Sequence, residues 1–244
     1  LREEKMLTHR EPSKPPSCHR PKEHVATDPN QVWSWDIPYL KTPIKGVFLF
    51  LYMMVDVWSR KIVAARVFDS ELSEHASRLL IEACIRLGID PLGIVLHADN
   101  GGPMKGATML ATMQNLGVVA SFSRPRVSDD NPYSEALFRT MKYRPEYPSH
   151  PFASIEEAQA WVDAFVLWYN TEHLHSAIRF VTPDDRHYGR EEGILNRRHQ
   201  VYREAQRGNP HRWSGSTRNW EPVQEVRLNP DIKSNGQSEW ELAA

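Results

Sequence analysis

Cysteine is scarce in this chain, and neither sign of charge dominates it. The 244 residues contain two cysteines, Cys18 and Cys84, so the chain has no disulfide framework and suits a reducing compartment. A zinc site built on Cys18 and His19 lacks a second cysteine at ligand spacing. The net charge of −1 gives no global electrostatic attraction for a polyanion. Any such attraction must come from the local distribution of charge.

Long hydrophobic runs are also absent. The longest wholly apolar run extends from Val47 to Val55 and is less than half of the ~20 residues that a membrane-spanning helix needs. No signal peptide precedes this run. We therefore expect a cytoplasmic protein without a membrane partner. The chain begins with Leu1 rather than Met, which indicates a fragment of a longer protein.

The composition is otherwise that of an ordinary globular chain, with 40% hydrophobic and 25% charged residues. Five prolines among charged residues mark 1–30 as an extended linker. We expect a compact domain over 31–190 and a basic C-terminal segment over 191–244. Between Asn196 and Trp220, six arginines with interleaved aromatics oppose one acid, which fits either a surface that follows a nucleic-acid backbone or a solvated tail.

Hydrophobic periodicity predicts an α/β fold in which a mixed five-stranded sheet is flanked by helices. The first three strands follow one another directly and are expected to be antiparallel. Helices then alternate with the last two strands. The predicted strands are Val32 to Tyr39, Gly46 to Val57, Lys61 to Phe68, Ile94 to Ala98 and Val118 to Phe122. The predicted helices between them run from a Ser70 cap to Leu87 and from Lys105 to Leu116.

The next helix carries a carboxylate and an amine on one face. Asn131 is a good N-cap, and Pro132 fits the first helical position. Glu135 then falls near the first turn, and Lys142 follows seven residues later, which is almost two whole turns. Both side chains therefore point in the same direction.

A longer helix begins with a capping box formed by Ser154 and Glu157 and is expected to end near Asn170. Beyond the compact domain, the segment Val223 to Leu228 has the composition of one more strand. Residues from Ser234 onward are expected to form a loose terminus.

Two acids upstream of Glu135 stand near predicted strand ends, where the active residues of an α/β sheet are expected. Asp36 lies in the first strand, and Asp99 directly follows the fourth. Three converging carboxylates suit Mg²⁺ or Mn²⁺, and two such ions roughly 4 Å apart can activate an attacking oxygen and stabilise a leaving oxygen at phosphorus. Lys142 would then hold a substrate phosphate. Taken singly, each acid is better explained as a turn former or a solvated residue.

Other polar residues have weaker claims on this site. Asp56 either approaches it or closes a hairpin by bonding to Ser59 or Arg60. His97 is expected to pack or bond within its strand.

Two histidines in a later segment, His173 and His175, are expected to contact substrate or to support a helix end. Metal binding by either is disfavoured because the three acids already supply hard ligands.

The order and spacing of the acids resemble the catalytic region of bacterial insertion-sequence transposases of the DDE superfamily, the group shared with retroviral integrases and typified by the insertion sequence three (IS-three) family. Thirty-five residues separate Asp99 from Glu135, and Lys142 follows two turns later. The likeness covers roughly residues 30–190. The motifs that carry it are Trp35-Asp36, His97-Ala98-Asp99-Asn100-Gly101, Ser128-Asp129-Asp130-Asn131-Pro132-Tyr133-Ser134-Glu135-Ala136, Tyr169-Asn170 with His173, His175 and Ser176, and Thr182-Pro183. Arg212-Trp213-Ser214-Gly215 and Asn219-Trp220-Glu221-Pro222 resemble the C-terminal segment of the family.

This resemblance implies a ribonuclease H-like fold in which Asp36, Asp99 and Glu135 are the catalytic acids and the ligands of two Mg²⁺ or Mn²⁺ ions. It implies cleavage and joining of DNA strands, with water or a 3′-hydroxyl as the attacking group. The expected partners are element ends, target DNA and further copies of the chain, at the bacterial nucleoid. DNA contacts are expected from Lys142, Asn100, Arg124, Arg139, Arg197, Arg198 and Arg212.

Three positions depart from the family pattern: Pro38 replaces the usual Thr, Ala98 the usual Ser, and His173 the usual Arg. A proline two residues after a catalytic acid removes a backbone donor from a strand. Two alternatives therefore stay open, a degenerate copy that binds DNA without cutting it and a nuclease of the same fold that cuts without joining. No helix-turn-helix and no zinc-binding module of the retroviral kind precedes the core, so recognition of element ends is expected in a missing N-terminal part.

Overall fold

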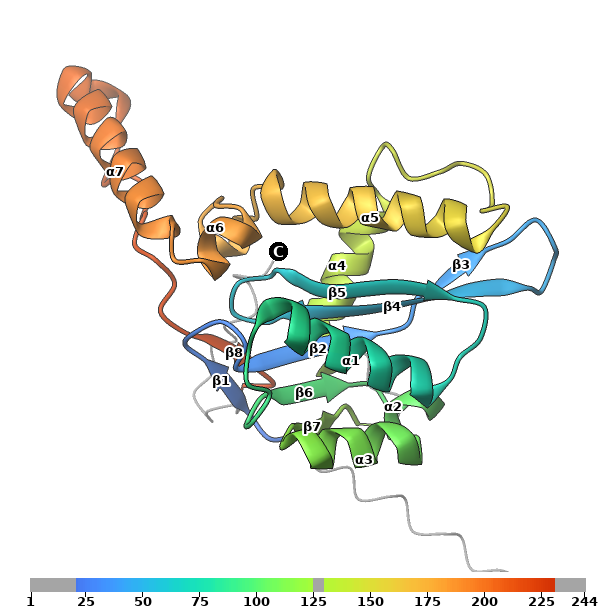
Figure 1. Cartoon of the computed structure of the whole chain (residues 1–244). Coiled ribbons are helices and arrows are strands. Elements are labelled where there is room, and N and C mark those ends of the chain that lie inside the picture. The colour runs from blue at the N-terminus through green and yellow to red at the C-terminus, as the bar shows by residue number, and fades with distance from the viewer. Residues whose placement is uncertain (1–20, 125–129, 231–244) are drawn as a thin grey trace, which may run out of the picture.

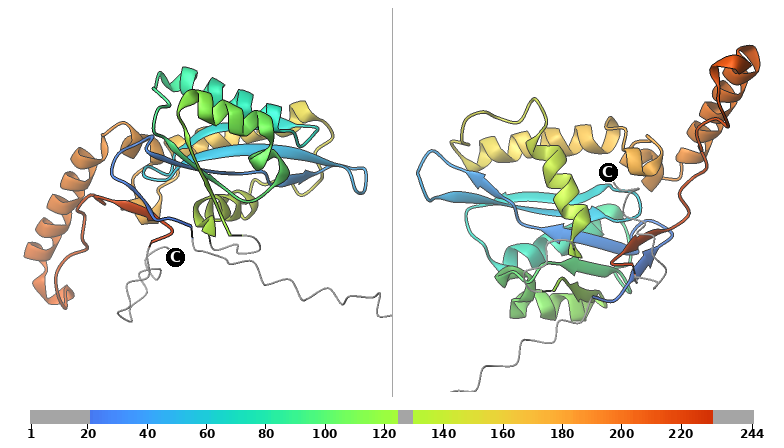
Figure 2. Two further views of the ribbon diagram at one scale, coloured as in Figure 1. Left: turned by 90° about the horizontal axis from the view of Figure 1, so that it is seen from below. Right: turned by 180° about the vertical axis from the view of Figure 1, so that it is seen from behind.

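The computed structural model of the chain describes residues 21–124 and 130–230. A mixed sheet with helices on both faces forms its body (Figures 1 and 2). The strands are β1 (His24–Ala26), β2 (Val32–Asp36), β3 (Tyr39–Lys41), β4 (Phe48–Asp56), β5 (Ile62–Phe68), β6 (Val95–Ala98), β7 (Val119–Phe122) and β8 (Val226–Leu228). The α-helices are α1 (Ser73–Leu87), α2 (Gly102–Lys105), α3 (Ala107–Leu116), α4 (Pro132–Lys142), α5 (Ile155–Thr171), α6 (Pro183–His187) and α7 (Glu191–Gly208). Short 3₁₀ turns lie at Ser176–Ile178 and Pro210–Arg212.

Six strands occupy five positions across the main sheet. β2 and β3 lie along the same edge of β4 in one register, because Asp36 pairs with Met53 and Tyr39 pairs with Phe50. β5 is antiparallel to the other edge of β4. β6 runs parallel to β2, and β7 runs parallel to β6. The predicted five-stranded mixed sheet with an antiparallel start is confirmed.

Pro38 interrupts the first predicted strand without changing its register. Leu51 donates its amide hydrogen to the Pro38 carbonyl at 3.1 Å, but proline has no amide hydrogen with which to return the bond. The ladder is therefore broken between Asp36 and Tyr39, and one expected strand becomes two. The proline is accommodated at this break, and pairing with β4 continues on both sides of it.

Different helices cover the two faces of the sheet. On one face, Trp33, Trp35 and Tyr52 pack in a hydrophobic cluster with α1 and α3. On the other face, Leu51 and Met53 pack with α4 and α5 (Figure 2). Successive residues of a strand point to opposite faces, so each central strand contributes to both layers.

The helix starts differ from the prediction in two places. Ser70 does not cap α1, whose N-cap position is Leu72 and has no side-chain cap bond. The hydroxyl of Tyr52 instead accepts the Leu72 amide hydrogen at 2.7 Å, which ties the start of α1 to the sheet. The helix expected from Lys105 to Leu116 is present as α3, which begins at Ala107, and the short helix α2 before it was not predicted. Ser154 caps α5 as predicted, since its hydroxyl accepts the Glu157 amide hydrogen, but the Glu157 carboxylate accepts the Ala153 amide hydrogen and not that of Ser154.

The two ends of the described chain meet in a small second sheet. β1 pairs with β8 in antiparallel register, with Val25 opposite Arg227. Strand pairing thus begins at His24, earlier than the start near Gln31 that proline content suggested. Local composition cannot anticipate this pairing, because the two strands lie at opposite ends of the chain.

The basic C-terminal segment contains a helix of 18 residues, α7, where the sequence suggested a tail with one strand. It projects from the body at the end of the sheet away from the arrowhead of β6 (Figure 1). Arg186, which is fully buried, anchors its start by donating to both carboxylate oxygens of Glu191 at 2.9 and 2.8 Å. The same guanidinium donates to the carbonyls of Trp58 and Val223. One arginine therefore joins α7 to the β4–β5 turn and to the chain that returns toward β8.

Several sequence expectations concern residues outside the described ranges. These are most of the linker, the Cys18–His19 pair, the Ser128-Asp129 part of the acidic motif and the terminus from Ser234. Within 21–124 and 130–230, no helix is both long enough and apolar enough to cross a membrane.

Candidate active site

Asp36 ends β2 and is the most strongly perturbed of the three candidate acids. It follows Trp35 and therefore faces the α4 side of the sheet, and its Oδ1 accepts the amide hydrogen of Ile37 at 2.8 Å. Burial raises the pKa of its carboxyl from the ordinary 3.8 to about 6, the Ile37 bond opposes the rise, and the charges of Asp99 and Glu135 add to it. The field of both other acids thus acts on Asp36.

Asp99 directly follows β6 and is half-buried. The hydroxyl of Ser123, which follows the neighbouring strand β7, donates to Asp99 Oδ1 at 2.7 Å. Parallel strands β6 and β7 end at the same edge of the sheet, so the residues just beyond them meet. Sequence reasoning missed Ser123, since no motif connects a serine to an acid 24 positions earlier.

Glu135 lies in the first turn of α4 and is exposed. The helix begins at Pro132 as predicted, but Asn131 does not cap it through its side chain. The Asn131 amide instead donates to the Trp35 carbonyl at 3.2 Å, and its oxygen accepts from the Ser34 hydroxyl. Asn131 is 1% exposed, so this link between α4 and β2 is shielded from water. It holds the helix that carries Glu135 against the strand that carries Asp36.

The three acids share an electrostatic environment without forming a compact ligand cluster. Over 21–124 and 130–230, no three His, Cys, Asp or Glu side chains gather at the spacing of a metal site. The acids come from three separate elements, and the pKa of Asp36 shows that the negative charges of Asp99 and Glu135 reach it. Mutual repulsion of this kind favours a cation, and carboxylate oxygens are the donors that Mg²⁺ and Mn²⁺ prefer. The chemistry of these carboxylate donors therefore suits a divalent ion, while their positions in the described residues do not form a ligand set.

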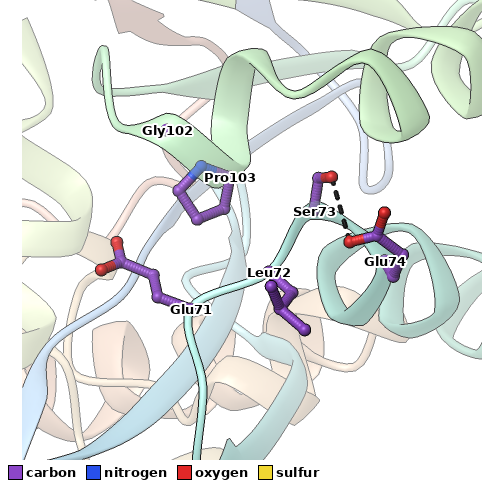
Figure 3. Close-up of a pocket in the computed structure, with 6 residues that line it drawn as sticks. All are labelled: Glu71, Leu72, Ser73, Glu74, Gly102 and Pro103. Carbon is purple, nitrogen blue, oxygen red and sulfur yellow. Dashed lines mark hydrogen bonds between the residues drawn. The ribbon is translucent and has the colours of Figure 1, made fainter.

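A fourth carboxylate, Glu71, borders this region and was missed by sequence reasoning. Its Oε2 accepts a hydrogen bond from the Tyr39 hydroxyl at 2.7 Å, and its charge is a further cause of the raised Asp36 pKa. Glu71 also lines an open pocket of about 350 Å³ between the start of α1 and α2 (Figure 3). Gly102 and Pro103 form the opposite wall and follow Asp99 closely in the chain. Asp36, Asp99 and Glu135 do not line this pocket.

The segment that leads from β7 to α4 is closed by an ion pair. Arg124 donates to both carboxylate oxygens of Asp130 at 3.0 Å, and its amide hydrogen binds the same carboxylate at 2.8 Å. Although burial opposes ionisation, these bonds and the charge of Arg124 hold the pKa of Asp130 below its usual value. Arg124, a predicted DNA contact, thus has a partner within the chain.

The remaining predicted DNA contacts fall into two groups. Arg139 and Lys142 are exposed on α4, the helix of Glu135, whereas the Asn100 amide donates to the Ser123 carbonyl. The arginines of the C-terminal segment lie on and beyond α7, away from the acids (Figure 1). Of these, Arg197 and Arg212 are exposed.

Arg198 is engaged by contacts within the chain. It donates to the carbonyls of Arg179 and Phe180 at 2.9 and 2.8 Å, and its guanidinium lies 5.5 Å from the centre of the Trp220 ring. These contacts give Arg198 a role in holding α7 to the turn after α5 and to the segment that returns toward β8.

Asp56 and His175, which the sequence suggested as further candidates for the site, have contacts that stabilise the fold. Asp56 is fully buried and closes the β4–β5 turn, because Ser59 donates to its Oδ1 through the amide and the hydroxyl at 2.7 and 2.6 Å. The ring of His175 accepts the Ala177 amide hydrogen at 3.2 Å and supports the turn after α5. Burial lowers the pKa of His175 to about 3, so its ring is neutral.

Comparison with protein families identifies the same domain type in two overlapping segments. A family model described as integrase core domain matches residues 26–128, and a second model with the same description matches residues 116–183. The matched region includes all three acids, Ser123 and Asn131.

Named relatives are bacterial transposases. The transposase for insertion sequence element IS904 of Lactococcus lactis subsp. lactis (strain IL1403) is 29% identical over 160 residues, which cover 66% of this chain and 62% of that protein. Transposase InsF for insertion sequence IS3A of Escherichia coli (strain K12) is also 29% identical over 160 residues, covering 65% of this chain and 54% of that protein. The match thus spans little more than half of the length of these relatives.

Solved structures show the same fold at lower identity. A chain of the simian T-cell lymphotropic virus intasome, solved in complex with PP2A regulatory subunit B56 gamma, has a TM-score of 0.54 at 20% identity, covering 71% of this chain and 60% of that chain. The catalytic core domain of BIV integrase has a TM-score of 0.50 at 17% identity, covering 68% of this chain and 98% of that chain. These similarities confirm the predicted ribonuclease H-like fold.

Proposed function

Because this chain belongs to the integrase core domain family, we propose that it is the catalytic part of a transposase that cuts element ends and joins them to target DNA. Asp36, Asp99 and Glu135 are the proposed catalytic acids. The observation that carries the proposal is where the acids lie within a matched integrase core. Asp36 ends β2, Asp99 directly follows β6, the parallel neighbour of β2, and Glu135 lies on α4, which is joined to β2 through Asn131.

In the proposed mechanism, Asp36, Asp99 and Glu135 would hold two Mg²⁺ or Mn²⁺ ions through their oxygens. The ions would supply activation of the attacking oxygen and stabilisation of the leaving oxygen at phosphorus. The chain itself fixes where the acids lie, through the Ile37 amide at Asp36 and the Ser123 hydroxyl at Asp99. No side chain has to form a covalent bond to DNA.

Positive charge on two surfaces suits the proposed DNA substrate. Lys142 and Arg139 are exposed on the same helix as Glu135, where they can contact phosphates near the cut. Arg197 and Arg212 are exposed on and beyond α7, where they can contact a more distant stretch of duplex. Because α7 projects from the body, we propose that it holds DNA that passes beyond the core, within a homo-oligomer on the element ends (Figure 1). The proposed substrate also places the protein at the bacterial nucleoid.

The strand pairing around Pro38 favours an active enzyme over a degenerate copy. Pairing with β4 continues on both sides of the proline, and Asp36 lies opposite Met53. The Ser34–Asn131 link to α4 is complete despite the proline four residues later.

A strand-transfer assay tests the proposal. Labelled duplexes with the sequences that flank the coding gene are incubated with the full-length protein that contains this chain and with either Mg²⁺, Mn²⁺ or a chelator, and products are separated by length. We expect joined products with either metal, none with chelator, and none with Asp99→Asn or Glu135→Gln. Asp28→Asn, at an exposed site, serves as the control and should join as wild type does. Joining by Asp99→Asn or Glu135→Gln would contradict the proposed site, and cutting without joining would indicate the nuclease alternative.

A further inference from the structure

The hairpin that joins β3 to β4 carries a cluster of apolar side chains into solvent. Ile44 and Val47 at its tip are 66% and 48% exposed. Toward its base, the rings of Tyr39 and Phe48 are also exposed, and their centres lie 5.8 Å apart. The hairpin projects from the body at the end of the sheet opposite to α7 (Figures 1 and 2). Exposed apolar side chains that gather in this way mark a site of contact with another molecule.

Internal hydrogen bonds hold the tip of this hairpin in one conformation. The Val47 amide donates to the Ile44 carbonyl at 3.1 Å and closes a turn in which Gly46 has a φ of +86°, a value that glycine adopts without strain. The Thr42 hydroxyl donates to the Val47 carbonyl at 2.9 Å and accepts the Ile44 amide hydrogen at 3.3 Å. The apolar side chains at the tip therefore stand on a preformed support, which lowers the entropy lost when they insert into a partner.

The charge around the tip decides which partner it suits. Lys41 and Lys45 are exposed on either side of Ile44, and the sequence contains no acidic residue between Ile37 and Val55. A two-fold contact of the tip with its own copy would place lysines against lysines. Duplex DNA carries phosphates outside and stacked, apolar base faces inside, so it complements an apolar tip that is flanked by lysines.

From these observations we propose that the β3–β4 hairpin is a wedge that inserts Ile44 between base pairs of duplex DNA from the minor groove. Lys41 and Lys45 then contact the phosphates beside the inserted side chain. Isoleucine and proline are among the side chains that part base steps in this way and kink the duplex by about 20 to 90°, and the exposed Pro43 directly precedes Ile44. The inference rests on the proposed function in that it takes DNA as the substrate.

Chain geometry limits how far the kink lies from the proposed cut. Ile44 stands eight positions after Asp36. An extended chain spans at most about 3.4 Å per residue, so the wedge acts within roughly 27 Å of Asp36. Successive nucleotides of one strand are about 3.4 Å apart along the duplex axis, so this reach corresponds to roughly eight base pairs. The hairpin therefore deforms the same stretch of duplex on which the acids are proposed to act.

The first experiment measures bending separately from binding. The full-length protein that contains this chain is added to short duplexes with the sequences that flank the coding gene, in a chelator so that no strand is cut. Energy transfer between dyes on the two duplex ends reports the bend, and fluorescence anisotropy reports the affinity. We expect wild type to increase the transfer. Ile44→Ser should lose at least half of this increase while binding weakens less than about fivefold, and Ile44→Leu should restore the bend.

The second experiment locates the opened base step. Permanganate oxidises thymines that have lost their stacking, so wild type should produce a reactive site in the bound duplex that Ile44→Ser does not produce. Ile85→Ser is the matched control for both experiments, because Ile85 is 75% exposed on α1, outside the hairpin. It should bend and open the duplex as wild type does. Thermal unfolding verifies that each variant is folded.

The lysines are tested by the salt dependence of binding. The Lys41→Gln/Lys45→Gln double variant should lower the slope of log affinity against log salt by about two, because each lost phosphate contact contributes about one. An unchanged slope would separate the hairpin from the phosphates and contradict the inference.

Further outcomes separate the wedge from its alternatives and from the proposed function. An unbent duplex with wild type, an equal bend with Ile44→Ser, or an equal loss with Ile85→Ser would overturn the wedge. So would a wild-type oligomer that sediments as such without DNA and that Ile44→Ser dissociates, because the tip would then be a contact between copies. Joining of ends by the same protein in Mg²⁺ is scored separately. Bending that depends on Ile44 without any joining would retain the wedge and refute the proposed transposase activity, and joining with a bend independent of Ile44 would do the reverse.

Discussion

Replacing Asp36 by Asn should stabilise the protein at neutral pH, although it removes a proposed catalytic group. The pKa of Asp36 is raised from 3.8 to about 6 in the folded chain, mainly by burial and further by neighbouring carboxylates. A raised pKa means that folding disfavours the ionised form. The penalty is absent well below pH 3.8, grows as pH rises toward 6 and is complete above it. Asn carries no charge at any pH, and its oxygen can still accept the Ile37 amide hydrogen.

The size of this effect follows from the shift. Each pKa unit corresponds to about 1.4 kcal/mol, so a shift of about two units sets an upper limit near 3 kcal/mol at pH 7.5. The side chain is half-buried, and water reduces the interaction between the acids. We therefore expect Asp36→Asn to raise the free energy of unfolding by about 1 to 2 kcal/mol at pH 7.5 and by about zero at pH 3.5.

Urea denaturation of both proteins at pH 3.5, 5 and 7.5 without divalent metal measures the difference. The exposed variant Asp28→Asn is the control and should change stability by less than about 0.5 kcal/mol at each pH. Addition of Mg²⁺ at pH 7.5 should stabilise wild type more than Asp36→Asn, because ligand binding adds to the stability of the folded state. An Asp36→Asn protein that is no more stable than wild type at pH 7.5, or a difference that does not vary with pH, would refute the reasoning.

Three further outcomes are expected. Asn131→Ala should cost about 2 to 3 kcal/mol in urea denaturation, because it removes two buried hydrogen bonds between the start of α4 and β2, to the Trp35 carbonyl and the Ser34 hydroxyl; a cost below 1 kcal/mol would show that α4 is held in another way. Arg186→Lys should lower the free energy of unfolding by about 3 kcal/mol or more in the same assay, since a lysine ammonium cannot replace the bonds of the guanidinium to both carboxylate oxygens of Glu191. An unchanged free energy of unfolding would contradict the anchoring of α7. Arg197→Ala should lower the slope of log affinity against log salt for duplex DNA by about one, and an unchanged slope would remove α7 from the DNA surface.

The layers of the fold could be predicted because each strand of the sheet has a local signature. Alternation of Trp33 and Trp35 with polar residues marked β2, and the aromatic and β-branched content of residues 46–57 marked β4. The division of the first strand at Pro38 depends on a single missing donor. The position of Pro38 can be read from the sequence. The sequence does not show that strand pairing continues beyond Pro38, because this pairing depends on β4.

Elements that depend on distant partners could not be predicted. β1 exists because β8 offers it hydrogen bonds from about 200 positions away, and proline-rich surroundings suggested a linker. In the C-terminal segment, arginine density concealed a helix with one buried apolar residue, Leu195, on the side that meets Trp220. The sequence therefore did not predict α7, whereas the strand that it predicted at Val223 to Leu228 is present as β8 (Val226–Leu228).

The candidate site likewise contains residues that sequence motifs indicate and residues that only the folded structure brings close. Asp36, Asp99 and Glu135 were proposed from the sequence because they stand in motifs at a defined spacing. Ser123 and Glu71 belong to no motif, and only folding brings them to Asp99 and to the region of Asp36. The Asn131 side chain satisfies a helix-cap pattern but bonds to β2, since the Ser34 hydroxyl donates to the oxygen that a cap would use.

The central claim is that Asp36, Asp99 and Glu135 serve one metal-binding site. Titration of Mn²⁺ into wild type, into Asp36→Asn, Asp99→Asn and Glu135→Gln, and into the Asp36→Asn/Glu135→Gln double variant tests it most directly. We predict that each single change weakens Mn²⁺ binding at least tenfold and that the double variant shows a cost different from the sum of its singles, as residues of one site do. Wild-type affinity in any of the three single variants, or strictly additive losses in the double, would contradict a shared site.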